Sequence, residues 1–143
     1  VNNSGRNILL KDILEKDVDE KLYLGEDLSK WEYMKGSKKI ERTHKDGHEY
    51  VFAEGKIAFP DHIDRASRTM LTSESSRNRS THVIRDPQTN RLRTLTPIEC
   101  ERLNGFPDNW TNTGMSNRFR YFCMGNALVV DLVKIIGSKI AEL

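Results

Sequence analysis

The sequence predicts an α+β fold with short antiparallel strands and separate helices, and three patterns predict it. The run His48–Phe52 is rich in strand-forming residues and follows Asp46-Gly47, a pair typical of hairpin turns. A helix-capping sequence begins at Thr96. Apolar residues then crowd 126–141, which predicts a terminal helix with a wide apolar surface. No βαβ repeat is visible, so these residues do not build a doubly wound parallel sheet.

The length of 143 residues suits one domain, and the composition excludes several classes of protein. No apolar run reaches the roughly 20 residues that cross a bilayer, so we expect no membrane partner. Residues 1–10 carry no export signal. Cys100 and Cys123 show no pairing motif, which argues against a disulfide scaffold and favours a cytoplasmic protein. His44 and His48 have no cysteine or acidic cluster beside them, so we expect no metal site.

The first half of the chain predicts two short helices and a hairpin. Apolar residues at helical spacing place one helix within 7–14, and mixed apolar anchors place a second near 27–35. The hairpin lies within 38–64, where glycines separate alternating residues.

The second half predicts two further strands and two helices. Strands at 68–72 and 81–85 flank a polar loop at 73–80, and the turn 86–90 leads back into 92–95. Thr96 is the expected N-cap, with a proline at the first helical position and a glutamate at the third. The last helix is expected over about 126–141.

The charge is unevenly distributed along the chain. Residues 1–64 hold 11 basic and 14 acidic side chains, residues 65–93 hold 7 and 2, and the remainder holds 5 of each. All seven cations of the middle stretch are arginines, the residue suited to bidentate contacts with phosphates and guanine edges. Nucleic acid is therefore the first partner to test, and the alternative is a solvated arginine-rich surface.

Three segments, in this order, resemble the C-terminal third of the DNA cytosine-5 methyltransferases. The stretch RTMLTSESSRNRSTHVIRD (68–86) resembles the variable target-recognition region, with Thr69-Met70 in the place of a Thr-Leu-like dipeptide. The stretch RTLTPIECERLNGFPDNW (93–110) resembles the ninth conserved block, and GNALVVDLV (125–133) resembles the tenth. The first 64 residues resemble the family only loosely.

Motifs of the earlier blocks are missing from this chain. It has no F-x-G-x-G donor loop, no Pro-Cys nucleophile, no Glu-Asn-Val and no Gln-x-Arg-x-Arg. Cys100 lies between two glutamates and is a poor nucleophile, so we expect no catalytic residue. The resemblance implies a linker and helix at 1–20, a target-recognition domain at 21–118, and a C-terminal helix at 119–143. That helix would pack on a Rossmann-like methyltransferase domain that is mostly absent.

The resemblance also implies which residues touch DNA and the methyl donor. The expected DNA contacts are Arg68, Thr69, Ser73, Arg77, Asn78, Arg79, Ser80, Thr81, Arg91 and Arg93. A purely structural Asx or Ser/Thr turn at 77–81 stays open as the alternative. Gly125, Asn126 and Ala127 would contact S-adenosylmethionine, since helix N-terminal N–H groups suit its carboxylate. An N-cap role alone is the alternative there.

The function implied is the DNA-recognition portion, as a fragment or small subunit, of a DNA cytosine-5 methyltransferase of restriction-modification or prophage type. Its partners would be duplex DNA with a flipped cytosine and a catalytic polypeptide that carries the missing blocks. We expect the chain to be inactive alone. Two rivals remain open: a stand-alone sequence-specific DNA-binding module, and an inert relic that dimerises through its C-terminal helix.

Overall fold

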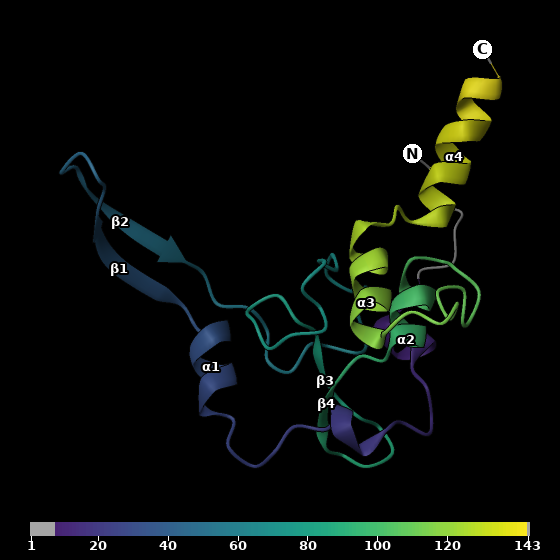
Figure 1. The fold of residues 1–143 in the computed structure, drawn as a ribbon, viewed down its shortest axis with the longest axis horizontal. Coiled ribbons are helices and arrows are strands. Elements are labelled where there is room, and N and C mark those ends of the chain that lie inside the picture. Colours follow the sequence, from purple (N-terminus) through teal and green to yellow (C-terminus); the bar gives the residue numbers. More distant parts are fainter. Residues whose placement is uncertain (1–7, 143) are drawn as a thin grey trace.

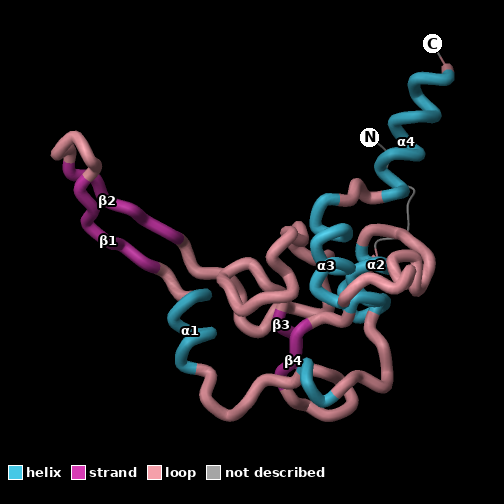
Figure 2. The backbone as a smooth tube through the Cα atoms, viewed as in Figure 1, coloured by secondary structure: helices cyan, strands magenta, loops and turns pink. Residues whose placement is uncertain are grey.

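The computed structural model describes residues 8–142 and shows a body from which two arms project (Figure 1). The body combines short strands, helices and long loops, which confirms the α+β class (Figure 2). The elements in chain order are the 3₁₀ helices η1 (Leu10–Ile13) and η2 (Glu20–Leu22), then α1 (Ser29–Lys35), β1 (Lys38–Thr43), β2 (Glu49–Glu54), β3 (Val83–Arg85), β4 (Leu92–Thr94), α2 (Pro97–Leu103), α3 (Asn117–Asn126) and α4 (Val130–Ala141).

The first arm is the predicted hairpin, which we call the ribbon (38–54). Strands β1 and β2 pair antiparallel, with Lys38 opposite Glu54 and Thr43 opposite Glu49. The turn is closed by His44 and His48, whose backbone N–H and C=O lie 2.7 Å apart. Gly47 has a φ of +87°, a conformation that favours glycine at this turn. The hairpin prediction is confirmed.

The core of the body joins segments that are far apart in the sequence. Strands β3 and β4 form the second antiparallel pair, and helices α2 and α3 pack on each other. The buried apolar cluster consists of Leu10, Ile13, Met70, Ile84, Leu95, Cys100, Tyr121 and Met124. The Tyr121 hydroxyl also donates to the Leu95 carbonyl at 2.7 Å. Burial raises the pKa of the Cys100 thiol.

Helix α2 begins where the capping sequence predicts. The Thr96 hydroxyl accepts from the Glu99 N–H at 3.0 Å, and the Glu99 carboxylate accepts from the Thr96 N–H at 2.8 Å. Pro97 is the first helical residue. The helix ends before Gly105, whose φ is +79°.

Two of the expected strands differ in the structure. Residues 68–72 form no strand, because their backbone lies against helix α3 and not beside another strand. The strand expected at 81–85 shortens to β3, and the N-terminal helix is the single turn η1; Asn7, where that helix was expected to begin, lies outside the described residues.

The terminal helix expected over about 126–141 is present as α4, and a separate helix, α3, precedes it, so the stretch 119–143 is not one helix. Ala127 adopts an extended conformation, and the chain turns so that the Val130 N–H donates to the Asn104 carbonyl at 2.9 Å. Hydropathy and length alone would let 117–141 cross a membrane. In the structure this stretch is two helices with a break between them, and α3 packs on α2.

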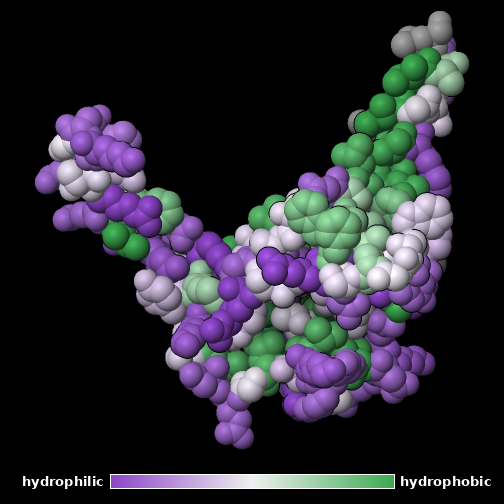
Figure 3. All heavy atoms as spheres, viewed as in Figure 1, coloured by the Kyte–Doolittle hydropathy of each residue, from purple (hydrophilic) through white to green (hydrophobic). Residues whose placement is uncertain are grey.

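Helix α4 is the second projecting arm, and its apolar side chains are exposed (Figure 3). The exposed apolar residues here are Leu128, Val129, Leu132, Val133, Ile135, Ile136 and Ile140. The apolar surface is as wide as the sequence predicts, and nothing in the described chain covers it.

Candidate nucleic-acid interface

Of the ten predicted DNA contacts, Arg93 lies deepest in the protein and has no exposed surface. Its guanidinium donates to Asp86 at 2.6 Å and to both Glu99 oxygens at 2.7 and 2.8 Å. Burial alone would raise the pKa of Asp86, but the hydrogen bond from Arg93 and two backbone N–H groups hold it below its usual value. Arg93 therefore organises the interior, and the prediction that it contacts DNA is wrong in this structure.

Arg68 is also committed to a carboxylate. It donates to the two Asp61 oxygens at 2.6 and 3.1 Å and to the Ser80 carbonyl at 3.2 Å. Asp61 in turn accepts from the Val83 N–H at 2.9 Å. Burial would raise the pKa of Asp61, yet these hydrogen bonds lower it, so the carboxylate stays charged. Arg68 ties its own segment to β3, although it remains partly exposed.

Arg79 fastens the ribbon to the body. It donates to the carbonyls of Met34 at 2.7 Å and Gly36 at 3.0 Å, and it also donates to the Gly55 carbonyl. Its Nε atom lies 3.6 Å from a Glu54 oxygen. One guanidinium thus joins the end of α1 to the two strand ends at the base of the ribbon, which is a structural role.

Asn78 and Thr81 close the loop from within. The Asn78 side-chain oxygen accepts from the N–H groups of Ser80 at 2.7 Å and Thr81 at 3.2 Å, while its amide nitrogen donates to the Ser73 carbonyl at 2.8 Å. Thr81 is buried and donates to the Ser76 carbonyl. This is the structural turn that the sequence left open as the alternative, so neither side chain is directed at a base.

A buried chain of polar groups supports the same loop. The His82 ring lies 3.1 Å from a Glu74 oxygen and 3.0 Å from the Ser67 hydroxyl. This resembles a nucleophile, base and carboxylate, but the Ser67 hydroxyl donates to the Arg68 carbonyl and His82 is fully buried. We assign these residues to holding the loop in place.

Besides Arg91, three predicted contacts are exposed: Thr69, Ser73 and Arg77. In the described part of the chain, none of their side chains has a hydrogen-bond partner. Arg77 lines a hollow of about 470 Å³ together with four residues of α1, which are Ser29, Lys30, Tyr33 and Met34. Arg91 is half exposed, but it donates to both Glu20 oxygens at 2.5 and 3.0 Å and stacks 4.3 Å over the Tyr23 ring.

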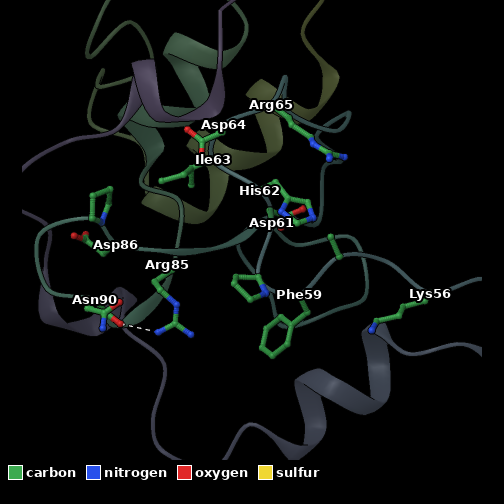
Figure 4. Close-up of a pocket in the computed structure, with 13 residues that line it drawn as sticks. Lys56, Phe59, Asp61, His62, Ile63, Asp64, Arg65, Arg85, Asp86 and Asn90 are labelled. Carbon is green, nitrogen blue, oxygen red and sulfur yellow. Dashed lines mark hydrogen bonds between the residues drawn. The ribbon is translucent and has the colours of Figure 1, made fainter.

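A second hollow, of about 790 Å³, lies between the segment 56–65 and the β3–β4 turn (Figure 4). Its three carboxylates come from Asp61, Asp64 and Asp86, and each already has a cation beside it. Its basic side chains are Lys56, Arg65 and Arg85, and Arg85 donates to the Asn90 carbonyl at 2.9 Å. The hollow therefore presents an excess of positive charge.

The predicted cofactor residues lie at the opposite end of a helix from the one expected. Gly125 and Asn126 end α3, and the Ala127 N–H donates to the Met124 carbonyl at 3.2 Å. A helix C-terminus offers carbonyl oxygens, so the prediction of N–H groups that capture a carboxylate is wrong. Asn126 is exposed, and its amide nitrogen donates to the Phe122 carbonyl at 3.0 Å, which leaves the amide oxygen to accept.

Gly125 brings the predicted cofactor segment against the predicted DNA segment. A Cβ atom at this position would lie 2.4 Å from the Thr72 backbone, so only glycine allows this approach. The contact places the end of α3 directly behind the residues between Thr69 and Ser73. Among residues 8–142 there is no cluster of three potential metal ligands.

Lys30, Tyr33, Lys56 and Arg65 were not among the predicted site residues. They come from separate stretches of the chain, and only the fold shows which exposed cations lack a carboxylate partner. The arginine count pointed to Arg65 but not to the two lysines.

Comparison with known proteins identifies the class. A model of the C-5 cytosine-specific DNA methylase family matches residues 2–142, and the chain belongs to this family. It is 53% identical over 139 residues to the type II methyltransferase M.Sau3AI of Staphylococcus aureus, covering 96% of this chain and 33% of that protein. It is 27% identical over 128 residues to the type II methyltransferase M.DsaV of Dactylococcopsis salina, covering 90% of this chain and 33% of that protein.

A solved structure shares the fold. The chain superposes on the crystal structure of the S. pombe Dnmt2 methyltransferase with a TM-score of 0.67 and 18% identity, covering 99% of this chain and 44% of that one. The chain spans about a third of the length of the curated relatives it matches.

Proposed function

We propose that this chain is the DNA-recognition portion of a DNA cytosine-5 methyltransferase of restriction-modification type, acting on duplex DNA in the cytoplasm. The observation that carries the proposal is the placement of the exposed residues Thr69, Ser73 and Arg77 on a loop that buried side chains hold in place. A cytosine must leave the stack before its ring carbon can be attacked, and such a loop suits contacts to the distorted duplex.

The proposal assigns the reaction itself to polypeptide outside this sequence. The chain carries no Pro-Cys pair, and Cys100 is buried with a raised pKa. S-adenosylmethionine would supply the methyl group. The carbonyl oxygens that end α3 and the amide oxygen of Asn126 suit an amino group of that donor, so Gly125, Asn126 and Ala127 would line one side of its site.

Helix α4 would attach the chain to the catalytic part. Its apolar side chains are exposed along the whole helix, and covering such a surface favours association. A homodimer through α4, as in an inert relic, is the competing assembly.

The test is complementation. The chain would be mixed with a polypeptide that carries the missing blocks, such as the remaining two-thirds of the M.Sau3AI relative, and transfer of labelled methyl groups to plasmid DNA would be measured. We expect transfer only when both parts are present. Methylation by this chain alone, or no transfer by the mixture, would contradict the proposal.

Matched variants on α4 separate docking from DNA binding. Leu132→Asp places a charge on the apolar surface, whereas Lys134→Asp places the same side chain about 200° around the helix. We expect the first variant to abolish complementation and the second to retain it, with DNA binding equal in both. Sedimentation of the chain alone distinguishes the dimer, which Leu132→Asp would dissociate.

A further inference from the structure

Within residues 8–142, the ribbon packs against nothing beyond its own base. Its two strands pair with each other, and residues 39–51 are exposed on both faces. An isolated two-stranded hairpin is marginally stable in water, so a ribbon of this kind is expected to have something to contact. Figure 1 shows it projecting from the body on the side away from α4.

The base of the ribbon is held firmly. Arg79 links it to α1, the Ile57 N–H donates to the Lys35 carbonyl at 2.9 Å, and the Lys38 ammonium lies 3.9 Å from Glu54. The outer end is therefore presented in a defined direction.

The two faces of the ribbon differ in charge. Residues opposite one another in the register share a face. One face carries Lys38, Ile40, Arg42, Tyr50, Phe52 and Glu54. The other carries Lys39, Glu41, Thr43, Glu49, Val51 and Ala53. On the first face the carboxylate, Glu54, lies at the base beside Lys38 and Arg79. The Arg42 guanidinium stacks 4.1 Å from the Phe52 ring centre. On the second face two glutamates lie along the outer half.

The first face continues onto α1. The Lys38 ammonium lies 4.5 Å from the Tyr33 ring centre, and Tyr33, which is 68% exposed, lines the same hollow as Lys30 and Arg77. We call this surface the α1–ribbon stripe. Its members are Lys30, Tyr33, Lys38, Arg42, Tyr50 and Arg77.

Three cations of the stripe are available to a partner. Within residues 8–142, Lys30, Arg42 and Arg77 have no carboxylate within 4.0 Å of their charged nitrogens. The nearby Asp27 is engaged by the Ser29 hydroxyl at 2.6 Å and by the Ser29 N–H at 3.0 Å, and these bonds lower its pKa. It stays ionised and offsets only part of the positive charge.

We propose that the α1–ribbon stripe lies along the phosphate backbone of duplex DNA, next to the segment gripped by Thr69 and Ser73. This inference rests on the proposed DNA-recognition function. Unpaired cations interleaved with exposed aromatic rings are typical of surfaces that bind nucleic acid. The glutamates of the opposite face repel phosphate and so fix which face of the ribbon meets the duplex.

The experiment measures how the affinity of the 143-residue chain for duplex DNA depends on salt. The variants are Lys30→Gln, Arg42→Gln and Arg77→Gln, and the control is Lys39→Gln, which removes one cation from the opposite face of the same ribbon. Each phosphate contact contributes about 0.9 to the slope of log affinity against log salt. We expect each stripe variant to lower the slope by about 1 on duplexes of unrelated sequence, and the control to leave it unchanged.

The outcomes separate this inference from the function beneath it. If the chain binds duplex DNA and Lys39→Gln changes the slope as much as Arg42→Gln, or the stripe variants change nothing, the stripe is not the contact surface and the proposed function stands. If the unmodified chain binds no duplex DNA, the stripe inference and the proposed function both fail. Circular dichroism of each variant shows that the fold is retained, which the exposure of all four side chains favours.

Discussion

Arginines of the same short stretch have opposite surroundings in two regions of this protein. In the interior, Arg93 is enclosed by Asp86 and Glu99 and has no exposed surface. On the α1–ribbon stripe, Arg77 is exposed and has no carboxylate beside it. The carboxylates of Arg93 lie within seven residues of it and are brought beside it by the β3–β4 turn and the start of α2. The carboxylate nearest to Arg77 in sequence, Glu74, is instead buried against His82. A cluster of arginines in a sequence therefore does not by itself locate a DNA interface.

The largest effect is expected at the interior arginine. Arg93→Ala would leave Asp86 and Glu99 buried without their cation, and breaking a buried ion pair costs about 3–5 kcal/mol. The free energy of unfolding, measured by urea denaturation, should fall by this amount. A change below about 1 kcal/mol would contradict the internal role of Arg93 and return it to the set of DNA contacts.

The next largest effect is expected at Arg79, which fastens the ribbon to the body. Arg79→Ala leaves the partly buried carbonyls of Met34 and Gly36 without their donor, at a cost of about 1 kcal/mol. We also expect the ribbon to lose protection from proteolysis, because its anchor is gone. The salt slope of the DNA affinity distinguishes the roles: Arg79→Lys would keep the charge and the slope, yet still loosen the ribbon.

The sequence predicted those parts of the fold that depend on local chemistry. The hairpin turn at Asp46-Gly47 and the capping box of Thr96 and Glu99 are both present, because each is closed by hydrogen bonds between near neighbours. The strand expected at 68–72 is absent, because α3 occupies that side of the segment. The terminal helix expected over about 126–141 is present as α4, but it begins four residues later and a separate helix, α3, precedes it, since the contact of Val130 with the end of α2 is not encoded locally.

The candidate site was predictable only in part, for the same reason. The resemblance placed the loop, but it did not reveal that Asn78 serves the loop's internal structure and that Arg79 fastens the ribbon to the body. The stripe joins Arg77 with α1 and the ribbon, which lie more than 20 residues earlier in the chain. Which cation is free is decided by tertiary neighbours, and one sequence does not show them.

The stability of the fold at acid pH should also depend on the ion pairs of the interior. The pKa values of three buried carboxylates are lowered in the folded protein, although burial alone would raise them. Hydrogen bonds outweigh the burial: Arg68 donates to Asp61, Arg93 donates to Asp86, and Thr111 and Arg120 donate to Glu101. Depressed carboxyl pKa values stabilise the fold above the unfolded values, near 4, and this stability is lost as the pH falls through the folded values. Unfolding measured from pH 6 to pH 2 should show the loss.

The matched variant for the acid experiment is Asp61→Asn. Removing this carboxylate removes its share of the pH dependence, so the variant should be less stable at pH 6 and closer to the unmodified protein at pH 2. A pH profile parallel to that of the unmodified protein would mean that the ion pair with Arg68 does not persist in solution.

The smallest effect is expected for the arginine that is both exposed and paired. Arg91 donates to Glu20 and stacks on Tyr23, yet water reaches about half of its side chain. Arg91→Gln should lower the thermal midpoint less than Arg79→Ala does, because exposed ion pairs contribute little. At 1 M salt, where the Debye length is about 3 Å, the difference should shrink further. A Glu20→Gln variant should lower the thermal midpoint by a similar amount. A double variant no less stable than either single variant would show that the pair acts as a unit. If Arg91→Gln changed the salt slope of DNA affinity and Glu20→Gln did not, Arg91 would instead belong to the DNA-contacting surface.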